Sequence, residues 1–264
     1  MKAHPVFRVL WCGANALLLV SLIAFAYGLV WEYKTRQYLQ GFADAIAPLD
    51  ASPGERVEAI LQWLQSAPPR HPDGETVSLR DPQNTLNYQH LLRVCSTATN
   101  AFINLAVSRD VPARRLLLLD ANHEAKHVVA EVRLENRWVV VDPLYRVVLR
   151  DAQGRLLTKE QLRDATIFEQ ATRGIPDYRP EYTYDSTTHV RLARIRVVGL
   201  STWRMLDRLV PGWGSSVYSS LVLERPSLAL TVVMGLLLAA CLVLLFVLGW
   251  YGRRRLQVSL LLRD

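Results

Sequence analysis

The sequence predicts an α+β domain flanked by two membrane-spanning helices. Two long apolar runs without charge stand near the ends of the chain. Between them, the segment after Cys95 has helical periodicity, and the segment after His127 alternates like an antiparallel hairpin. The expected fold is a Cys-bearing helix packed on an antiparallel sheet, with a transmembrane helix on each side.

The two apolar runs extend from Val9 to Trp31 and from Leu228 to Trp250. Each exceeds the roughly 20 residues that a helix needs to cross a bilayer. A cleaved signal peptide is the alternative for the first run, because Ala24-Phe25-Ala26 imitates a cleavage site. The apolar core of a signal peptide is only about 7–15 residues long, however, so two retained spans are expected.

Basic residues beside the spans predict their orientation. Arg253, Arg254 and Arg255 follow the second span directly, and such residues stay on the cytoplasmic side. Lys2 and Arg8 place the N-terminus on the same side. We therefore expect a two-pass protein of the inner (cytoplasmic) membrane, with both termini cytoplasmic and the soluble domain periplasmic or extracytoplasmic.

The charge pattern favours some partners and excludes others. The net charge is +7, and the basic residues are scattered rather than clustered. Scattered positive charge fits contact with anionic lipid or an envelope polymer. The chain has no nucleic-acid recognition motif, so the lipid bilayer is an expected partner and nucleic acid is not.

The segments predict six regions in order. They are a transmembrane helix at 1–31, a juxtamembrane helix or linker at 32–51, a soluble domain at 52–200, an interfacial segment at 201–226, a transmembrane helix at 227–252 and a cytoplasmic tail at 253–264.

The soluble domain opens with a helix. Ser52 is the expected N-cap, Pro53 fits the first position, and Glu55 completes a capping box. The apolar face of this helix consists of Val57, Ile60, Leu61 and Leu64. The segment from Thr85 to Leu92 fits either a helix or another structure.

Further elements follow Cys95. Its helix should end at Asp110 and Pro112, because a proline cannot continue a helix. Beyond the hairpin, the expected elements are a strand within Tyr145 to Asp151, a short helix from Thr158 and a strand from Val190 to Val198.

The hairpin runs from His127 to Val141 and should turn near Glu135 to Arg137. If Leu134 and Arg137 flank the turn, Asp142 lies opposite Val129 and on the same face as His127. Diagonal neighbours on one face of a sheet are within reach of long side chains. We therefore expect Asp142 to contact the imidazole and to select its tautomer.

Cys95 is the candidate nucleophile. Cys12 and Cys241 lie in the apolar runs, which leaves Cys95 as the single cysteine of the soluble domain. The N-terminus of a helix favours a thiolate, and a nearby imidazolium lowers the pKa of the thiol further. The backbone N–H of Cys95 can also donate to an oxyanion. Cys95, His127 and Asp142 thus form a candidate nucleophile, base and orienting group.

Plain structural explanations exist for each residue taken singly. Cys95 can be a small buried apolar residue, His127 a strand residue and Asp142 a strand end. His123 is a rival base in the loop before the hairpin. The spacing of His123, Glu124 and His127 fits no strong zinc motif, so no metal and no organic cofactor is expected.

Two segments, "VCSTATNAFINLAVSRDVPARRL" and "HVVAEVRLENRWVVVDP", resemble the bacterial transglutaminase-like superfamily, whose core is shared with papain-type cysteine proteases. The family pattern is a Cys that heads a helix, a "GIPAR"-like stretch and "HxWxEVxxxGxWxxxDP". Asp110 to Arg114, Trp138 and the pair Asp142-Pro143 match it, and the resemblance covers Pro53 to Leu149.

The resemblance implies that Cys95 is the nucleophile, His127 the base and Asp142 the orienting residue of a transglutaminase-like or papain-like core. Three positions depart from the family pattern, namely Val94, Val129 and the Asn136-Arg137 pair at the hairpin turn. The sequence identifies no second oxyanion donor, and Gln89 is a weak candidate for it.

Two classes of function follow. The first is a membrane-anchored thiol enzyme, either a cysteine protease or amidase or a transglutaminase-type acyltransferase. Its substrate would be an envelope peptide, protein or amide-bearing glycan. Water exclusion decides between hydrolysis and transamidation, and sequence does not reveal it. The alternative is a non-catalytic or accessory interaction module that binds other membrane proteins in an envelope polysaccharide, secretion or assembly complex.

Overall fold

The structure is a computed structural model that describes residues 5–66, 81–189 and 217–256 of the 264-residue chain. The chain divides into two compact units, which we describe separately. The first comprises Met1–Lys34 and Ser227–Asp264, and the second comprises Thr35–Pro226.

The first unit contains two apolar helices. They are the N-terminal part of α1 (Pro5–Ile46) and helix α9 (Pro226–Tyr251), which ends in a π-helical turn at Gly252–Leu256. Both helices are long and apolar enough to cross a membrane, as the sequence predicts. Glycines let them approach closely, since a Cβ atom on Gly28 would lie 2.9 Å from Oγ1 of Thr231.

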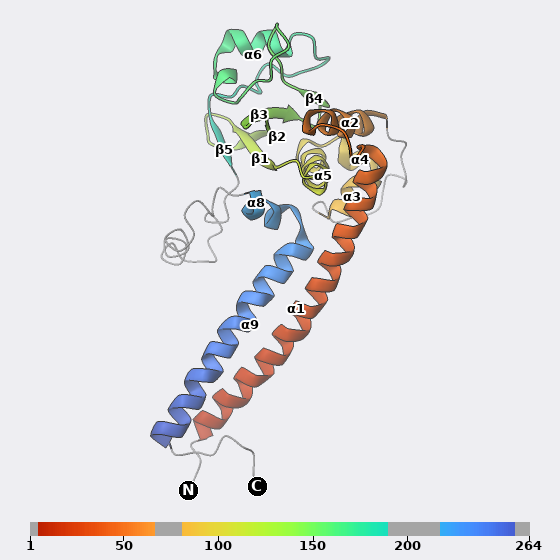
Figure 1. The fold of residues 1–264 in the computed structure, drawn as a ribbon. Coiled ribbons are helices and arrows are strands. Elements are labelled where there is room, and N and C mark those ends of the chain that lie inside the picture. Colours follow the sequence, from red (N-terminus) through yellow and green to blue (C-terminus); the bar gives the residue numbers. More distant parts are fainter. Residues whose placement is uncertain (1–4, 67–80, 190–216, 257–264) are drawn as a thin grey trace. The chain divides into compact units, whose positions relative to one another are not determined.

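The second unit is built on a five-stranded antiparallel sheet of order β4-β3-β2-β1-β5 (Figure 1). The strands are β1 (Ala113–Leu119), β2 (Ala125–Leu134), β3 (Arg137–Asp142), β4 (Val147–Val148) and β5 (Thr187–His189). This sheet confirms the predicted mixture of helices and antiparallel strands.

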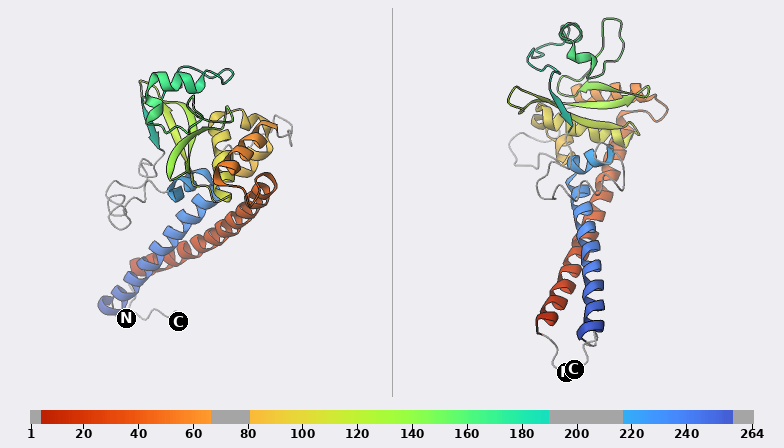
Figure 2. Two further views of the ribbon diagram at one scale, coloured as in Figure 1. Left: turned by 45° about the horizontal axis from the view of Figure 1, so that its top comes forward. Right: turned by 90° about the vertical axis from the view of Figure 1, so that its left-hand side faces the viewer.

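Helices cover both faces of this sheet. They are α2 (Pro53–Ser66), α3 (Pro82–Asn87), α4 (Gln89–Leu92), α5 (Cys95–Ser108), the 3₁₀ turn η1 (Gln161–Arg163), α6 (Ala165–Thr172) and α8 (Val217–Glu224). Helices α5 and α8 lie on one face and α6 lies beyond the other, as the views in Figures 1 and 2 agree.

A continuous apolar core fills the space on the α6 side of the sheet. Its buried residues come from all parts of this layer: Leu116, Leu118, Val129, Val140, Leu149, Leu157, Leu162, Phe168, Tyr182 and Tyr184. The core joins the central strands to the segment that follows β4. This segment, residues 149–184, thereby closes over the end of the sheet where the candidate residues lie.

The start of the soluble domain agrees with the sequence prediction. The backbone N–H of Ser52 donates to Oε2 of Glu55 at 2.7 Å, and the N–H of Glu55 donates to Oγ of Ser52 at 3.4 Å, which closes the capping box. The predicted apolar face of α2 is buried in full. Helix α1 ends at Ile46, before Pro48, as expected.

Other elements differ from the prediction in their extent. The segment from Thr85 to Leu92 forms two short helices, α3 and α4. The strand expected within Tyr145 to Asp151 is only the two-residue β4 and one isolated bridge. The helix expected from Thr158 is preceded by the turn η1, because the Asp164 side chain caps α6 from the N–H groups of Thr166 and Ile167. The strand predicted at 190–198 lies outside the described residues.

Candidate active site

The hairpin of β2 and β3 has the predicted register. Leu134 pairs with Arg137, and Ala130 pairs with Val141. The two turn residues, Glu135 and Asn136, have φ of 50° and 61°, the left-handed pair that a two-residue hairpin turn requires. Asn tolerates this conformation well, while Glu adopts it at a cost. The prediction of the hairpin is confirmed.

A β-bulge stands at the mouth of the hairpin. Leu118 pairs with His127, but Leu119 pairs with Ala125, so Lys126 has no partner on β1. Bulges turn side chains away from the regular alternation and are frequent beside active sites. This bulge directly precedes His127. The orientation of the imidazole is therefore set by a local irregularity that strand alternation alone does not predict.

His127 and Asp142 are in direct contact. Nε2 of His127 lies 2.7 Å from Oδ2 of Asp142, and both side chains are completely buried. Oδ1 of Asp142 accepts hydrogen bonds from the backbone N–H groups of Leu144 at 3.1 Å and Tyr145 at 3.4 Å. These bonds orient the carboxylate, which in turn leaves Nδ1 of His127 as the ring nitrogen available to another group.

Cys95 occupies the first position of α5 and is half-buried. The N-cap residue, Val94, supplies no side-chain cap, so the first N–H groups of the helix have none. Thr97 stabilises this turn by donating its hydroxyl to the carbonyl oxygens of Leu91 and Val94. The expectation of a partly exposed thiol at a helix start is confirmed.

The Cys95 thiol and the His127 imidazole shift each other's pKa. Burial opposes ionisation of the thiol, but hydrogen bonding and the charge of His127, with backbone hydrogen bonds from Val128 and Ser96, lower the pKa of Cys95. Burial also opposes protonation of the imidazole, yet its bonds to Asp142 and Cys95 raise the pKa of His127 to about 9. The pair is therefore electrostatically suited to a thiolate and an imidazolium.

An aromatic wall covers the imidazole. The ring of Tyr182 stacks on His127 with centroids 4.0 Å apart and planes 2° apart, and Tyr145 meets it edge-on at 6.1 Å. Burial raises the pKa of Tyr178 and Tyr184, which keeps both phenols protonated. Sequence reasoning missed these residues. The spacing of the tyrosines in "DYRPEYTYD" was the one available signal.

The rival base lies elsewhere. His123 is exposed in the turn between β1 and β2, where its φ is 61°. The side chain of Asp120 holds that turn by accepting from the N–H groups of Asn122 and Glu124. Gln89, the weak oxyanion candidate, is the half-buried first residue of α4.

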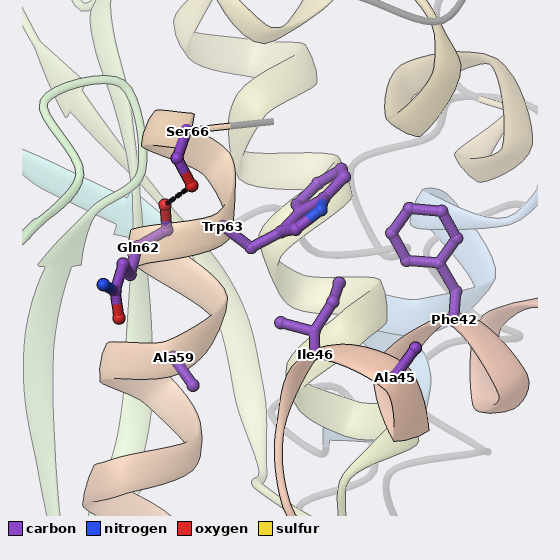
Figure 3. Close-up of a pocket in the computed structure, with 7 residues that line it drawn as sticks. All are labelled: Phe42, Ala45, Ile46, Ala59, Gln62, Trp63 and Ser66. Atoms are coloured by element: carbon purple, nitrogen blue, oxygen red, sulfur yellow. Dashed lines mark hydrogen bonds between the residues drawn. The ribbon is translucent and has the colours of Figure 1, made fainter. Parts of the chain in front are cut away.

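An open pocket of about 350 Å³ lies apart from these residues, between the end of α1 and helix α2 (Figure 3). Its lining consists of Phe42, Ala45, Ile46, Ala59, Gln62, Trp63 and Ser66. The rings of Phe42 and Trp63 meet edge-on, with centroids 4.9 Å apart. None of the three candidate residues lines this pocket, so it is a separate feature.

A half-buried cysteine at a helix start, beside an imidazole that a buried carboxylate orients, has the geometry of a thiol acyl-transfer site. Residues 40–143 match the family model of the transglutaminase-like superfamily, a range that includes all three candidate residues. The chain therefore contains a transglutaminase-like domain, as the resemblance implied. Comparisons with curated proteins and with solved structures gave no match.

Proposed function

We propose that this protein is a membrane-anchored thiol enzyme that cleaves or transfers an acyl group from an amide. Cys95 is the nucleophile, His127 the acid and base, and Asp142 the orienting residue. The observation that carries the proposal is the buried 2.7 Å contact between His127 and Asp142, with Nδ1 of the imidazole left for the thiol. A structural hairpin needs no such contact, and burying the pair has a desolvation cost.

In the proposed acylation step, Sγ of Cys95 attacks the amide carbonyl carbon and a tetrahedral oxyanion forms. The N–H of Cys95, at the uncapped start of α5, donates to this oxyanion, and Gln89 is the candidate for a second donor. The C–N bond then breaks while Nδ1–H of His127 protonates the leaving amine. The products are an amine and a thioester on Cys95.

In the second step, neutral His127 removes a proton from the acceptor as it attacks the thioester. Water as acceptor yields a carboxylate, and an amine yields a new amide. Both outcomes regenerate the thiol and balance the protons. The aromatic wall of Tyr145 and Tyr182 excludes water from one side of the imidazole, and an amine acceptor would profit from this exclusion.

We further propose that the two apolar helices anchor the domain in the inner (cytoplasmic) membrane, with the domain on the extracytoplasmic side. The arginines at 253–255 support this orientation, because such residues resist translocation. The available substrates are then envelope peptides, proteins or amide-bearing glycans, and other membrane proteins of an envelope complex are within reach as partners.

The reactivity of Cys95 tests the enzyme proposal without a known substrate. Full-length protein in detergent would be treated with iodoacetamide, and modification of each cysteine would be followed by mass spectrometry. We expect Cys95 to react far faster than Cys12 and Cys241, and His127→Ala to slow it at least tenfold. The exposed His123 supplies the matched control, so His123→Ala should leave the rate unchanged.

A trapped intermediate tests the chemistry itself. Incubation with an envelope peptide mixture should add an acyl mass to Cys95 that hydroxylamine removes, because hydroxylamine cleaves thioesters. The adduct should be absent from Cys95→Ala. A Cys95 thiol of ordinary reactivity that ignores His127→Ala would contradict the proposal and favour an interaction module.

A further inference from the structure

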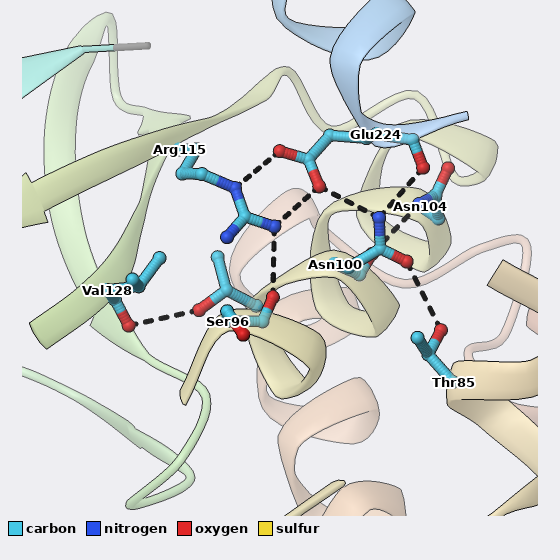
Figure 4. Close-up of polar contacts among 8 residues, drawn as sticks. Thr85, Ser96, Asn100, Asn104, Arg115, Val128 and Glu224 are labelled. Carbon is cyan, nitrogen blue, oxygen red and sulfur yellow. Dashed lines mark hydrogen bonds and ion pairs between the residues drawn. The ribbon is translucent and has the colours of Figure 1, made fainter. Parts of the chain in front are cut away.

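A buried ion pair connects helix α8 to the turn that carries Cys95 (Figure 4). Nε of Arg115 lies 2.5 Å from Oε1 of Glu224, and Nη2 lies 2.6 Å from Oε2. The same Nη2 donates to the carbonyl oxygen of Ser96 at 2.9 Å. Because Ser96 directly follows Cys95, the guanidinium bridges α8 to the first turn of α5.

Further polar groups fix the carboxylate of Glu224. Nδ2 of Asn100, one turn along α5, donates to Oε2 and to the backbone oxygen of Glu224, both at 2.8 Å. Thr85 in turn donates to Oδ1 of Asn100 at 3.2 Å. Only 3% of the Glu224 side chain and 13% of the Arg115 side chain are exposed. The pair is thus held in one geometry on both of its sides.

The first turn of α5 depends on such external contacts. Its N-cap residue, Val94, has no capping side chain. The hydroxyl of Thr99 donates to the carbonyl oxygen of Val128 at 3.1 Å, which ties the helix to β2 next to His127. Arg115 provides the second tie, at Ser96. Since Cys95 and His127 belong to different elements, these two ties define how the thiol meets the imidazole.

The choice of residues points to positioning rather than to simple packing. An apolar pair of similar volume would join α8 to the sheet at least as strongly, because it avoids the desolvation of two charges. A lysine would supply a single ammonium in place of the planar fork. Only an arginine can hold a carboxylate with two hydrogen bonds and still donate to a carbonyl oxygen.

We propose that Glu224 is a positioning residue for the nucleophile: through Arg115 it holds the first turn of α5, and with it Cys95, in place against His127. The inference rests on the proposed function. Glu224 stands two positions before Pro226, where α9 begins. The reactivity of the thiol is thereby tied to the segment that leads into the second apolar helix.

The test removes both charges together, since a single substitution would leave a buried charge unpaired. In the double variant Arg115→Met with Glu224→Gln, the Gln amide oxygen still accepts from Asn100, but the contact with Ser96 is lost. We expect its melting temperature to stay near the wild-type value while iodoacetamide modifies Cys95 at least tenfold more slowly. Hydrogen exchange of the backbone amides at 95–99 should become at least tenfold faster.

The neighbouring ion pair supplies a matched control. Arg114 also lies on β1 and pairs with a buried carboxylate, that of Glu131, at 2.8 Å, with 15% and 1% of the side chains exposed. The double variant Arg114→Met with Glu131→Gln should leave the reactivity of Cys95 and the exchange at 95–99 within twofold of wild type.

Two outcomes would overturn the inference. One is unchanged exchange at 95–99 in the Arg115–Glu224 double variant, whatever its alkylation rate. The other is equal slowing of alkylation in both double variants, which would indicate a general loss of packing. Failure of the proposed function is visible separately, in a wild-type thiol that ignores His127→Ala, because hydrogen exchange does not depend on thiol chemistry.

Discussion

The imidazole of His127 lies flat on the phenol ring of Tyr182, with ring centroids 4.0 Å apart and planes inclined by 2°. This stack restrains the plane of the imidazole, while Asp142 restrains its rotation within that plane by the bond to Nε2. The two contacts come from segments on opposite sides of the hairpin in sequence. Together they define where Nδ1 points.

Replacing Tyr182 tests the contribution of the stack. Tyr182→Phe keeps the ring and should leave the alkylation rate of Cys95 near the wild-type value. Tyr182→Leu keeps apolar volume but removes the ring, and should slow alkylation about tenfold, because an aromatic pair contributes about 0.5–1.5 kcal/mol beyond its buried area. Equal rates in the two variants would show that the stack does not orient His127.

Asp142→Asn should reduce thioester formation at Cys95 on the order of 10²–10⁴-fold. Asp142 accepts hydrogen bonds on both oxygens, from His127 on Oδ2 and from backbone N–H groups on Oδ1. An amide has one oxygen, so one of these contacts would set two donors against each other. The matched control is Asp164→Asn at the start of α6, because asparagine caps helices as well as aspartate does. Normal activity of Asp142→Asn would contradict the assigned role.

The raised pKa of His127, about 9, predicts an alkaline limit to amide cleavage. Acylation needs the imidazolium to protonate the leaving amine, so turnover should fall as the pH rises through about 9. On the acid side, turnover should fall as the thiolate of Cys95 is protonated, at a pH below the ordinary thiol value, since its pKa is lowered. The two limits belong to the coupled pair, and a rate profile from pH 4 to 10 measures both.

The same two shifts have opposite effects on stability. The raised pKa of His127 contributes stability that is complete below pH 6.5 and is lost as the pH rises through about 9. The lowered pKa of Cys95 contributes stability above pH 9, which is lost as the pH falls through the folded value. In the wild type they oppose each other between about pH 6.5 and 9, so the melting temperature should change little.

Removing the thiol isolates the histidine in this stability measurement. Cys95→Ser retains the bond between His127 and Asp142, so its melting temperature should decline as the pH rises above 6.5. Thermal melts of both proteins across this range check the difference. Parallel curves for the two proteins would show that the thiol and the imidazole are not coupled.

Reporter fusions test the orientation in the membrane. A reporter active only in the periplasm should work after Ala51 and fail at Asp264, and a reporter active only in the cytoplasm should do the reverse. The expected pattern follows from the arginines after the second span, which resist translocation. The opposite pattern would exclude envelope substrates. A mature chain that begins just after Ala26 would show that the first span is a signal peptide.

The elements with strong local signals were predictable from sequence. The apolar runs, the capping box of Ser52 and Glu55, and the hairpin around Asn136 each depend on a few neighbouring residues and on a fixed period. The contact between His127 and Asp142 was predictable for the same reason, because a two-residue turn sets the pairing of the strands that flank it.

The remaining contacts of the site depend on residues far apart in the chain. Tyr182 lies 55 positions after His127 and Glu224 lies 109 positions after Arg115, and no local period records either meeting. The bulge at Lys126 is likewise set by pairing with β1. Sequence alone therefore determined the candidate residues and the hairpin that joins two of them. Tertiary packing decided how the thiol faces the imidazole, because that arrangement is a balance of long-range contacts between separate elements.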